Sequence, residues 1–202
     1  MVRRFSILAA VLLCSLLLPS ALLANTVYTF DDLSSSVIGT PFPYTEDGLT
    51  ANFTSPSDFA PFLNGFAIAD ASAFGFTTLS GNVLLTNVPD SELDVAFSSD
   101  INAISLLFGF GGFSTDTITL TAFENGTEVG SATADPSLGS LFPEGSLLFD
   151  GGGASFNSIS LTSTAGYFAV DNVTIVPEPA SLFLLGSGIL AVAGKLRRGL
   201  KR

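Results

Sequence analysis

The sequence has no histidine and no tryptophan, and its single cysteine, Cys14, lies in an apolar run near the N-terminus. Without histidine the chain has no imidazole for acid/base catalysis, for a Ser-His-Asp or Cys-His nucleophile, or for a zinc site. Without a second cysteine no intrachain disulfide can form. These absences exclude the commonest hydrolase, zinc and haem chemistries.

Basic residues are also scarce, and all seven lie near the two ends of the 202-residue chain. Glu178 is the only one of the 18 acidic residues outside segment 25–176, which therefore holds 17 acidic residues and no lysine or arginine. Nucleic acid binding needs basic side chains on the working domain, so this function is excluded. The segment can form no side-chain salt bridge, and its surface repels anionic lipids and acidic polysaccharides unless divalent cations intervene.

The N-terminus has the order of residues found in a secretory signal. Arg3 and Arg4 precede an apolar run over 7–18, and small residues follow as far as Ala24. This order predicts a signal helix over 1–24, which signal peptidase removes after Ala24. The bulky Leu13 directly before Cys14 is incompatible with a lipoprotein signal, so the mature chain has no cysteine.

The C-terminus combines Pro177-Glu178-Pro179, a short apolar run over 182–194 and a basic tail. The run is shorter than the roughly 20 residues that span a bilayer with ease, and the basic tail should stay cytoplasmic. Segment 177–202 resembles the PEP-CTERM sorting signal of Gram-negative bacteria that make exopolysaccharide. The resemblance implies transient insertion into the inner membrane, removal of the tail by an exosortase, and export to the cell surface or beyond.

Segment 25–176 predicts a single all-β domain. Short runs rich in Thr, Ser, Val, Ile and Phe alternate with Gly, Asn, Asp and Pro, and Asn125-Gly126 is a hairpin-turn signal. We expect about nine to eleven strands in one jelly-roll-like β-sandwich, with a more irregular stretch over 39–81. The expected strands include 27–31, 49–54, 92–98, 102–110, 117–123, 127–132, 147–149, 158–162 and 167–175.

Acidic residues interrupt the last expected strand, where a regular pleat would aim Asp171 into the core. A buried carboxylate that has no basic partner needs backbone N–H donors, a bulge that turns it outward, a raised pKa or a bound metal ion. Oxygen ligands without nitrogen or sulfur select Ca²⁺. A structural calcium ion and local capping at a bulge both remain open for Asp171 and Asn172.

The opening segment 28–33 and the closing segment 168–175 are similar to the β-sandwich ectodomains of PEP-CTERM proteins and to jelly-roll carbohydrate-binding modules. In such modules, acidic residues of the first and last strands often hold a structural calcium ion. The resemblance implies a calcium site formed by Asp31 or Asp32 with Asp171, helped by the amide of Asn172.

The function expected from these features is that of a non-enzymatic surface or matrix protein associated with extracellular polysaccharide. One alternative is a carbohydrate-binding module with Phe42, Tyr44 and Phe62 as ligand-facing aromatic residues, although such modules usually stack sugars on tryptophan or tyrosine. A second alternative is a glycoside hydrolase with a pair of carboxylates. The available pairs are Glu46 with Asp47, Glu92 with Asp94 and Glu124 with Glu128, each in a turn or on a polar strand face.

Overall fold

The computed structural model describes residues 25–55, 66–86, 92–112, 116–137 and 142–178. These residues belong to one compact unit, Ala24–Glu178. The expected signal helix, the expected C-terminal apolar helix and Phe62 lie outside the described residues. Within the described part of the chain, no helix is both long enough and apolar enough to cross a membrane.

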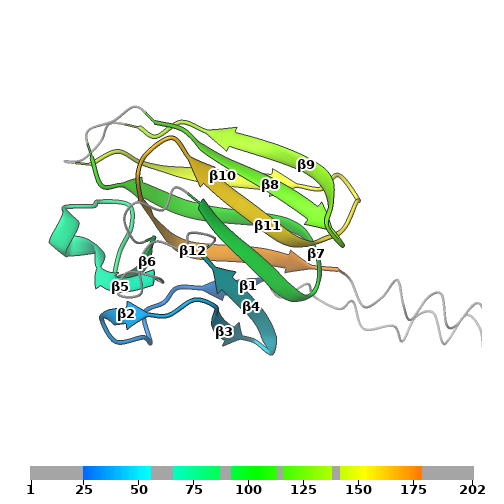
Figure 1. Cartoon of the computed structure of the whole chain (residues 1–202), viewed down its shortest axis with the longest axis horizontal. Coiled ribbons are helices and arrows are strands. Elements are labelled where there is room, and N and C mark those ends of the chain that lie inside the picture. Colours follow the sequence, from blue (N-terminus) through cyan, green and yellow to red (C-terminus); the bar gives the residue numbers. More distant parts are fainter. Residues whose placement is uncertain (1–24, 56–65, 87–91, 113–115, 138–141, 179–202) are drawn as a thin grey trace, which may run out of the picture. The chain divides into compact units, whose positions relative to one another are not determined.

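The described residues form twelve antiparallel strands and one short 3-10 helix, η1 (Ala71–Phe74) (Figure 1). The strands are β1 (Thr26–Tyr28), β2 (Ser36–Ile38), β3 (Phe42–Glu46), β4 (Leu49–Thr54), β5 (Phe66–Asp70), β6 (Asn82–Thr86), β7 (Glu92–Phe110), β8 (Ile118–Glu124), β9 (Thr127–Ala134), β10 (Glu144–Asp150), β11 (Phe156–Ser163) and β12 (Phe168–Pro177).

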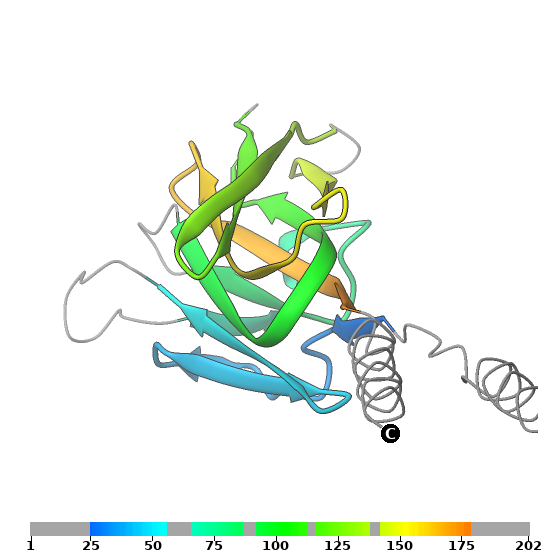
Figure 2. The ribbon, with the colours of Figure 1, turned by 90° about the vertical axis from the view of Figure 1, so that its right-hand side faces the viewer.

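The long strand β7 belongs to both sheets of a β-sandwich. Its residues 92–97 pair with β4 and β11, and its residues 103–109 pair with β12 and β10. One sheet therefore has the order β3-β4-β7-β11-β8-β9 and the other the order β2-β5-β6-β12-β7-β10, with β1 on β12. In Figure 2 the green β7 bends sharply between its two halves, as strands do when they change sheet at the corner of a sandwich.

Phenylalanine is the commonest residue of the core between the two sheets. This side chain has no polar tip to satisfy, and its full burial contributes about 1.5–3 kcal/mol. Apolar burial is therefore the main source of stability in a domain that has no salt bridges. The phenylalanines with no exposed surface are Phe30, Phe53, Phe66, Phe108, Phe110, Phe156 and Phe168.

The structure confirms the all-β sandwich and the hairpin at Asn125-Gly126, where φ is +50° and +80° between β8 and β9. One expectation was wrong, because the runs 92–98 and 102–110 are one continuous strand, β7. The described residues of the stretch 39–81 contain β3, β4 and β5 and a second hairpin turn at Asp47-Gly48, where φ is +49° and +79°.

Candidate functional site

The last strand of the sandwich leads directly into the C-terminal Pro177-Glu178-Pro179 sequence. Pro177, the final residue of β12, lies opposite Ile101 of β7. The next residue, Glu178, donates its backbone N–H to the carbonyl oxygen of Asp100 at 3.2 Å. The first two residues of the sequence are thus held at the end of the sheet, and Pro179 lies outside the described residues.

The segment 77–82 is bound by three carboxylates that come from distant parts of the chain, and Glu144 of β10 makes the most contacts. Glu144 is only 4% exposed. Its Oε1 accepts hydrogen bonds from the backbone N–H and the hydroxyl of Thr77, at 2.7 and 3.0 Å. Its Oε2 accepts the backbone N–H groups of Thr78 and Leu79, at 2.6 and 2.9 Å. These short, charge-assisted bonds fix the loop to the strand.

The other two carboxylates, those of Asp171 and Asp31, contact later residues of the same loop than Glu144 does. Asp171 is 1% exposed, and its Oδ2 accepts the N–H of Ser80 at 3.3 Å. Asp31 accepts the N–H of Asn82 at 2.8 Å. Between these contacts, Gly81 has φ +64°, and a Cβ there would lie 2.0 Å from an Asp31 carboxylate oxygen. Backbone N–H groups thus act as donors to these carboxylates in a domain that has no basic side chain.

Asp171 also caps a bulge in β12. Local capping at a bulge was one of the two alternatives for this residue, the other being calcium binding. The pairing of β12 with β7 shifts between Asp171 and Thr174, and Asn172 has φ +49°. The N–H of Asn172 donates to Asp171 Oδ1 at 2.7 Å. Burial raises the pKa of Asp171 to about 6, the N–H groups of Ser80 and Asn172 oppose this shift, and the negative charge of Asp31 adds to it.

Asp32 and Tyr44 form a separate contact, in which the Tyr44 hydroxyl donates to the Asp32 carboxylate. Burial, followed by this hydrogen bond, raises the pKa of Tyr44. The Tyr44 ring is 7% exposed and stacks on the rings of Phe30 and Phe42, with centroids 5.5 and 5.9 Å apart. The expectation that Tyr44 faces a ligand is wrong, because its ring lies in the core, whereas Phe42 is half-buried and packs against the core.

The four residues predicted to bind calcium are thus divided between two places. Asp31, Asp171 and Asn172 lie at the loop 77–82, and Asp32 is directed to Tyr44. The oxygens at the loop face N–H donors, whereas calcium requires oxygen ligands. The part of the chain that the structure describes contains no group of three or more acidic, histidine or cysteine side chains able to hold a metal ion. This donor set does not fit a calcium ion.

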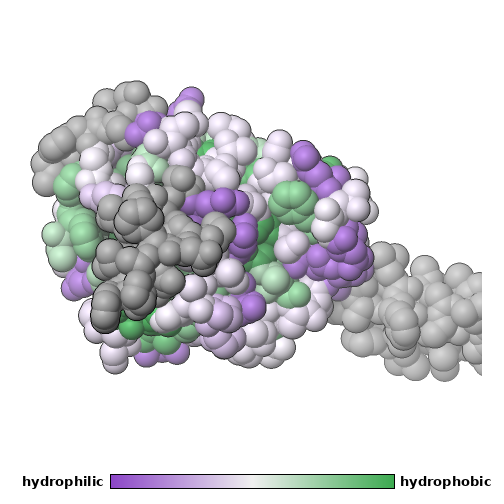
Figure 3. Space-filling view, viewed as in Figure 1, coloured by the Kyte–Doolittle hydropathy of each residue, from purple (hydrophilic) through white to green (hydrophobic). Residues whose placement is uncertain are grey.

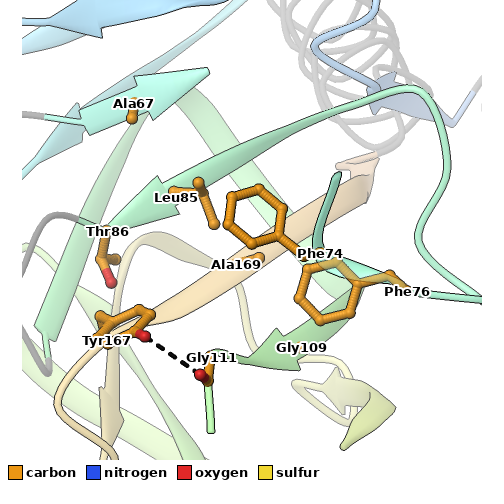
Figure 4. A pocket seen from close by; sticks show the side chains of 9 residues that line it. All are labelled: Ala67, Phe74, Phe76, Leu85, Thr86, Gly109, Gly111, Tyr167 and Ala169. Atoms are coloured by element: carbon orange, nitrogen blue, oxygen red, sulfur yellow. Dashed lines mark hydrogen bonds between the residues drawn. The ribbon is translucent and has the colours of Figure 1, made fainter. Parts of the chain in front are cut away.

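An apolar pocket of about 140 Å³ lies between the strand β12 and the segment that includes η1 (Figure 4). The rings of Phe76 and Tyr167 lie against Gly109 and Gly111, where a Cβ would approach them to 2.6 and 1.9 Å. The Tyr167 hydroxyl donates to the Gly111 carbonyl oxygen, and the Thr86 hydroxyl donates to the Phe168 carbonyl oxygen. The pocket therefore offers apolar contacts, and no acidic side chain lines it.

Hydroxyl groups cover the outer face of the sheet β3-β4-β7-β11-β8-β9. Alternate residues of β4, β8 and β11 are buried, and their outward neighbours are mostly serine and threonine. We call this surface the hydroxyl face; its serines and threonines are Thr45, Thr50, Thr54, Ser98, Thr119, Thr121, Ser131, Thr133, Ser158, Ser160 and Thr162. The view in Figure 3 mixes residues of near-neutral hydropathy with hydrophilic and hydrophobic ones.

The carboxylates considered for glycoside hydrolysis lie at turns or on the outer faces of strands. Glu46 ends β3, and Asp47 lies in the following turn. Glu92 accepts a hydrogen bond from the Ser160 hydroxyl at 3.0 Å. Glu124, the last residue of β8, accepts one at its Oε1 from the side-chain amide of Asn125 at 2.7 Å, whereas its Oε2 is buried without a hydrogen-bond partner among the described residues.

Comparison with known proteins identifies the C-terminal signal. The family described as the PEP-CTERM protein-sorting motif matches residues 176–198. No curated protein matches the chain significantly in sequence. A chain with this signal is an exported protein with a membrane-anchored intermediate, which an exosortase processes.

Several solved structures are similar to the chain in backbone arrangement at low identity. The K2 cleaved adhesin domain of Lys-gingipain is 12% identical with a TM-score of 0.47, covering 76% of this chain and 98% of that one. A DUF4465 family protein from Bacteroides caccae is 13% identical with a TM-score of 0.47, covering 77% and 100%. A fucose-binding module from Streptococcus pneumoniae is 14% identical with a TM-score of 0.35, covering 48% and 70%.

Proposed function

We propose that this chain is a non-enzymatic protein of the cell surface or extracellular matrix that associates with exopolysaccharide after an exosortase removes its tail. The observation that carries the proposal is the position of the sorting signal at the end of a complete sandwich. β12 finishes its pairing with β7 at Pro177, and the family match covers 176–198. Cleavage after this point would leave all the described core residues, the last of which is Ile175, in the released domain, so that domain would stay folded.

The surface of the domain suits association with a carbohydrate more than with an anionic macromolecule. The 17 acidic residues of 25–176 are opposed by no basic residue, so nucleic acids and anionic lipids are repelled. The hydroxyl face presents side chains that both donate and accept hydrogen bonds, as sugar hydroxyls do. A non-enzymatic role accords with two of the three carboxylate pairs, since Glu92 accepts a hydrogen bond from Ser160 and Glu46 and Asp47 lie at a strand end and turn.

The experiment that tests processing is intact mass spectrometry of the full chain expressed in a Gram-negative host with and without an exosortase. We expect the tail to be lost only in the host that has the enzyme. Glu178→Gln alters the motif and should reduce processing, whereas Glu128→Gln, which removes one exposed charge from β9, should be processed normally. A tail that is retained in both hosts would refute the proposal.

A further inference from the structure

We infer that the hydroxyl face binds a neutral, hydroxyl-rich polysaccharide that lies across the strands. This inference rests on the proposed association with exopolysaccharide, and it names the binding surface and the chemical class of the ligand. The hydroxyl face is distinct from the apolar pocket beside Tyr167, from the carboxylates at the loop 77–82, and from the aromatic residues Phe42 and Tyr44.

The central row of the hydroxyl face runs perpendicular to the strands. Strand register places Ser131 of β9 opposite Thr121, Thr121 opposite Ser160, Ser160 opposite Asp94, and Asp94 opposite Thr54 of β4. Each of these five residues has a side-chain oxygen on the outer face. Because neighbouring strands lie about 4.8 Å apart, the row extends over about 19 Å. An extended chain of several sugar units would meet a polar group at each strand.

An adjacent row supplies an aromatic ring and a flat surface. Phe123 of β8 lies opposite Ser158, Ser158 opposite Ala96, and Ala96 opposite Asn52 of β4. Phe123 is the only aromatic residue of β8. Its side chain is half-buried and lies on the same face of the strand as Thr121. Its ring can contact the C–H face of a sugar. The short side chain of Ala96 lets a ligand approach the sheet, where the Asn52 amide both donates and accepts hydrogen bonds.

The charges on this face select a neutral ligand. Asp94 lies in the central row, and its carboxylate can accept charge-assisted hydrogen bonds from sugar hydroxyls. Glu92 lies two residues away on the same face of β7 and already accepts a hydrogen bond from the Ser160 hydroxyl. An acidic polysaccharide would meet these two carboxylates and the negative field of the whole domain, with no basic group to receive it. A solvated protein surface ordinarily mixes both signs of charge over about a quarter of its residues, whereas this face is mostly hydroxyl.

Affinity electrophoresis of the full chain in a mild detergent tests the inference. Native gels would contain a neutral polysaccharide, namely hydroxyethylcellulose, dextran or a galactomannan, or acidic alginate. We expect at least one neutral polysaccharide to retard the protein and alginate not to do so. The double variant Thr121→Ala/Ser160→Ala should raise the dissociation constant about tenfold, the loss expected for two neutral hydrogen bonds. Phe123→Leu should also weaken binding.

The matched control is Ser146→Ala, which removes an exposed hydroxyl from β10 in the other sheet and should leave the dissociation constant unchanged. If no neutral polysaccharide retards the wild-type protein, both the hydroxyl face and the proposed polysaccharide association are wrong. If the wild-type protein is retarded and the double variant behaves like Ser146→Ala, only the assignment of this face is wrong. Retardation by alginate equal to that by a neutral polysaccharide would overturn the charge selectivity.

Discussion

Replacing Glu144 with glutamine tests whether backbone N–H donors take the place of basic side chains in this domain. Both oxygens of Glu144 are used, and together they accept three backbone N–H groups and one hydroxyl from residues 77–79. Glutamine has the same shape but only one acceptor oxygen. Its amide N–H₂ would face N–H donors that lie 2.6–2.9 Å from the present carboxylate oxygens.

The size of the effect follows from the number of bonds lost. A hydrogen bond to a charged group contributes about 1.5–3 kcal/mol, and a buried donor that loses its acceptor adds a desolvation cost. Loss of at least two such bonds should lower the free energy of unfolding by about 3–5 kcal/mol. In a domain of this size, 1 kcal/mol corresponds to about 2–4 °C, so the melting temperature should fall by roughly 6–20 °C.

Equilibrium urea unfolding at pH 7, followed by far-UV circular dichroism, measures this loss. Glu144→Gln should shift the midpoint to lower urea with an unchanged m-value, which reports a change in stability and not in the unfolded state. Glu128→Gln removes the same charge from the exposed side of β9 and should change the free energy by no more than about 0.5 kcal/mol. Equal midpoints for the two variants would refute the reasoning.

Three further predictions concern the same loop. Burial raises the pKa of Asp171 to about 6 in the folded protein, against 3.8 for an unperturbed aspartic acid, so ionisation of this group should lower the free energy of unfolding as pH rises from about 4 to 6. Over that range the free energy of unfolding of Asp171→Asn should rise by about 1–2 kcal/mol relative to wild type, after allowance for screening. Parallel curves of stability against pH for the two proteins would contradict this. Gly81→Ala places a Cβ against Asp31 and should lower the free energy of unfolding, measured in urea, by roughly 2–3 kcal/mol. This loss should exceed that of Gly126→Ala, where φ is also positive but no atom lies within 4 Å of the added Cβ; equal losses would show that the Asp31 contact is unimportant. Calcium and EDTA should each leave the melting temperature unchanged within about 1 °C in differential scanning calorimetry, whereas a calcium-dependent rise of roughly 5–10 °C would restore the predicted metal site.

Local sequence patterns were sufficient to predict most strands, because period-two alternation and turn chemistry act over a few residues. Leu93, Val95 and Phe97 are buried as their alternation predicts, and Asn125-Gly126 adopts the positive φ values that the hairpin requires. The continuity of β7 was not predictable in this way. Ser98-Ser99 resembles a strand break, but both residues are exposed in β7, at the bend between the two sheets.

The carboxylate contacts at the loop 77–82 were only partly predictable. The argument that a buried acid without a basic partner needs N–H donors identified Asp171 from its place in an alternating strand. Glu144 obeys the same argument, but its sequence neighbours, Pro143 and Gly145, give no alternation that would predict burial. Its donors lie 65–67 residues away in the chain. Such a contact is set by the sheet topology and leaves no local signal in the sequence.

The fractionation of the mature protein tests the central claim most directly. Cells that have an exosortase and secrete a neutral exopolysaccharide would express the chain, and the extracellular polysaccharide would be isolated by sedimentation. We expect the tail-processed form, identified by intact mass, to sediment with the polysaccharide and to be released when that polysaccharide is degraded enzymatically. Recovery of the processed form in the soluble fraction, or of an unprocessed form in the inner membrane alone, would contradict the account.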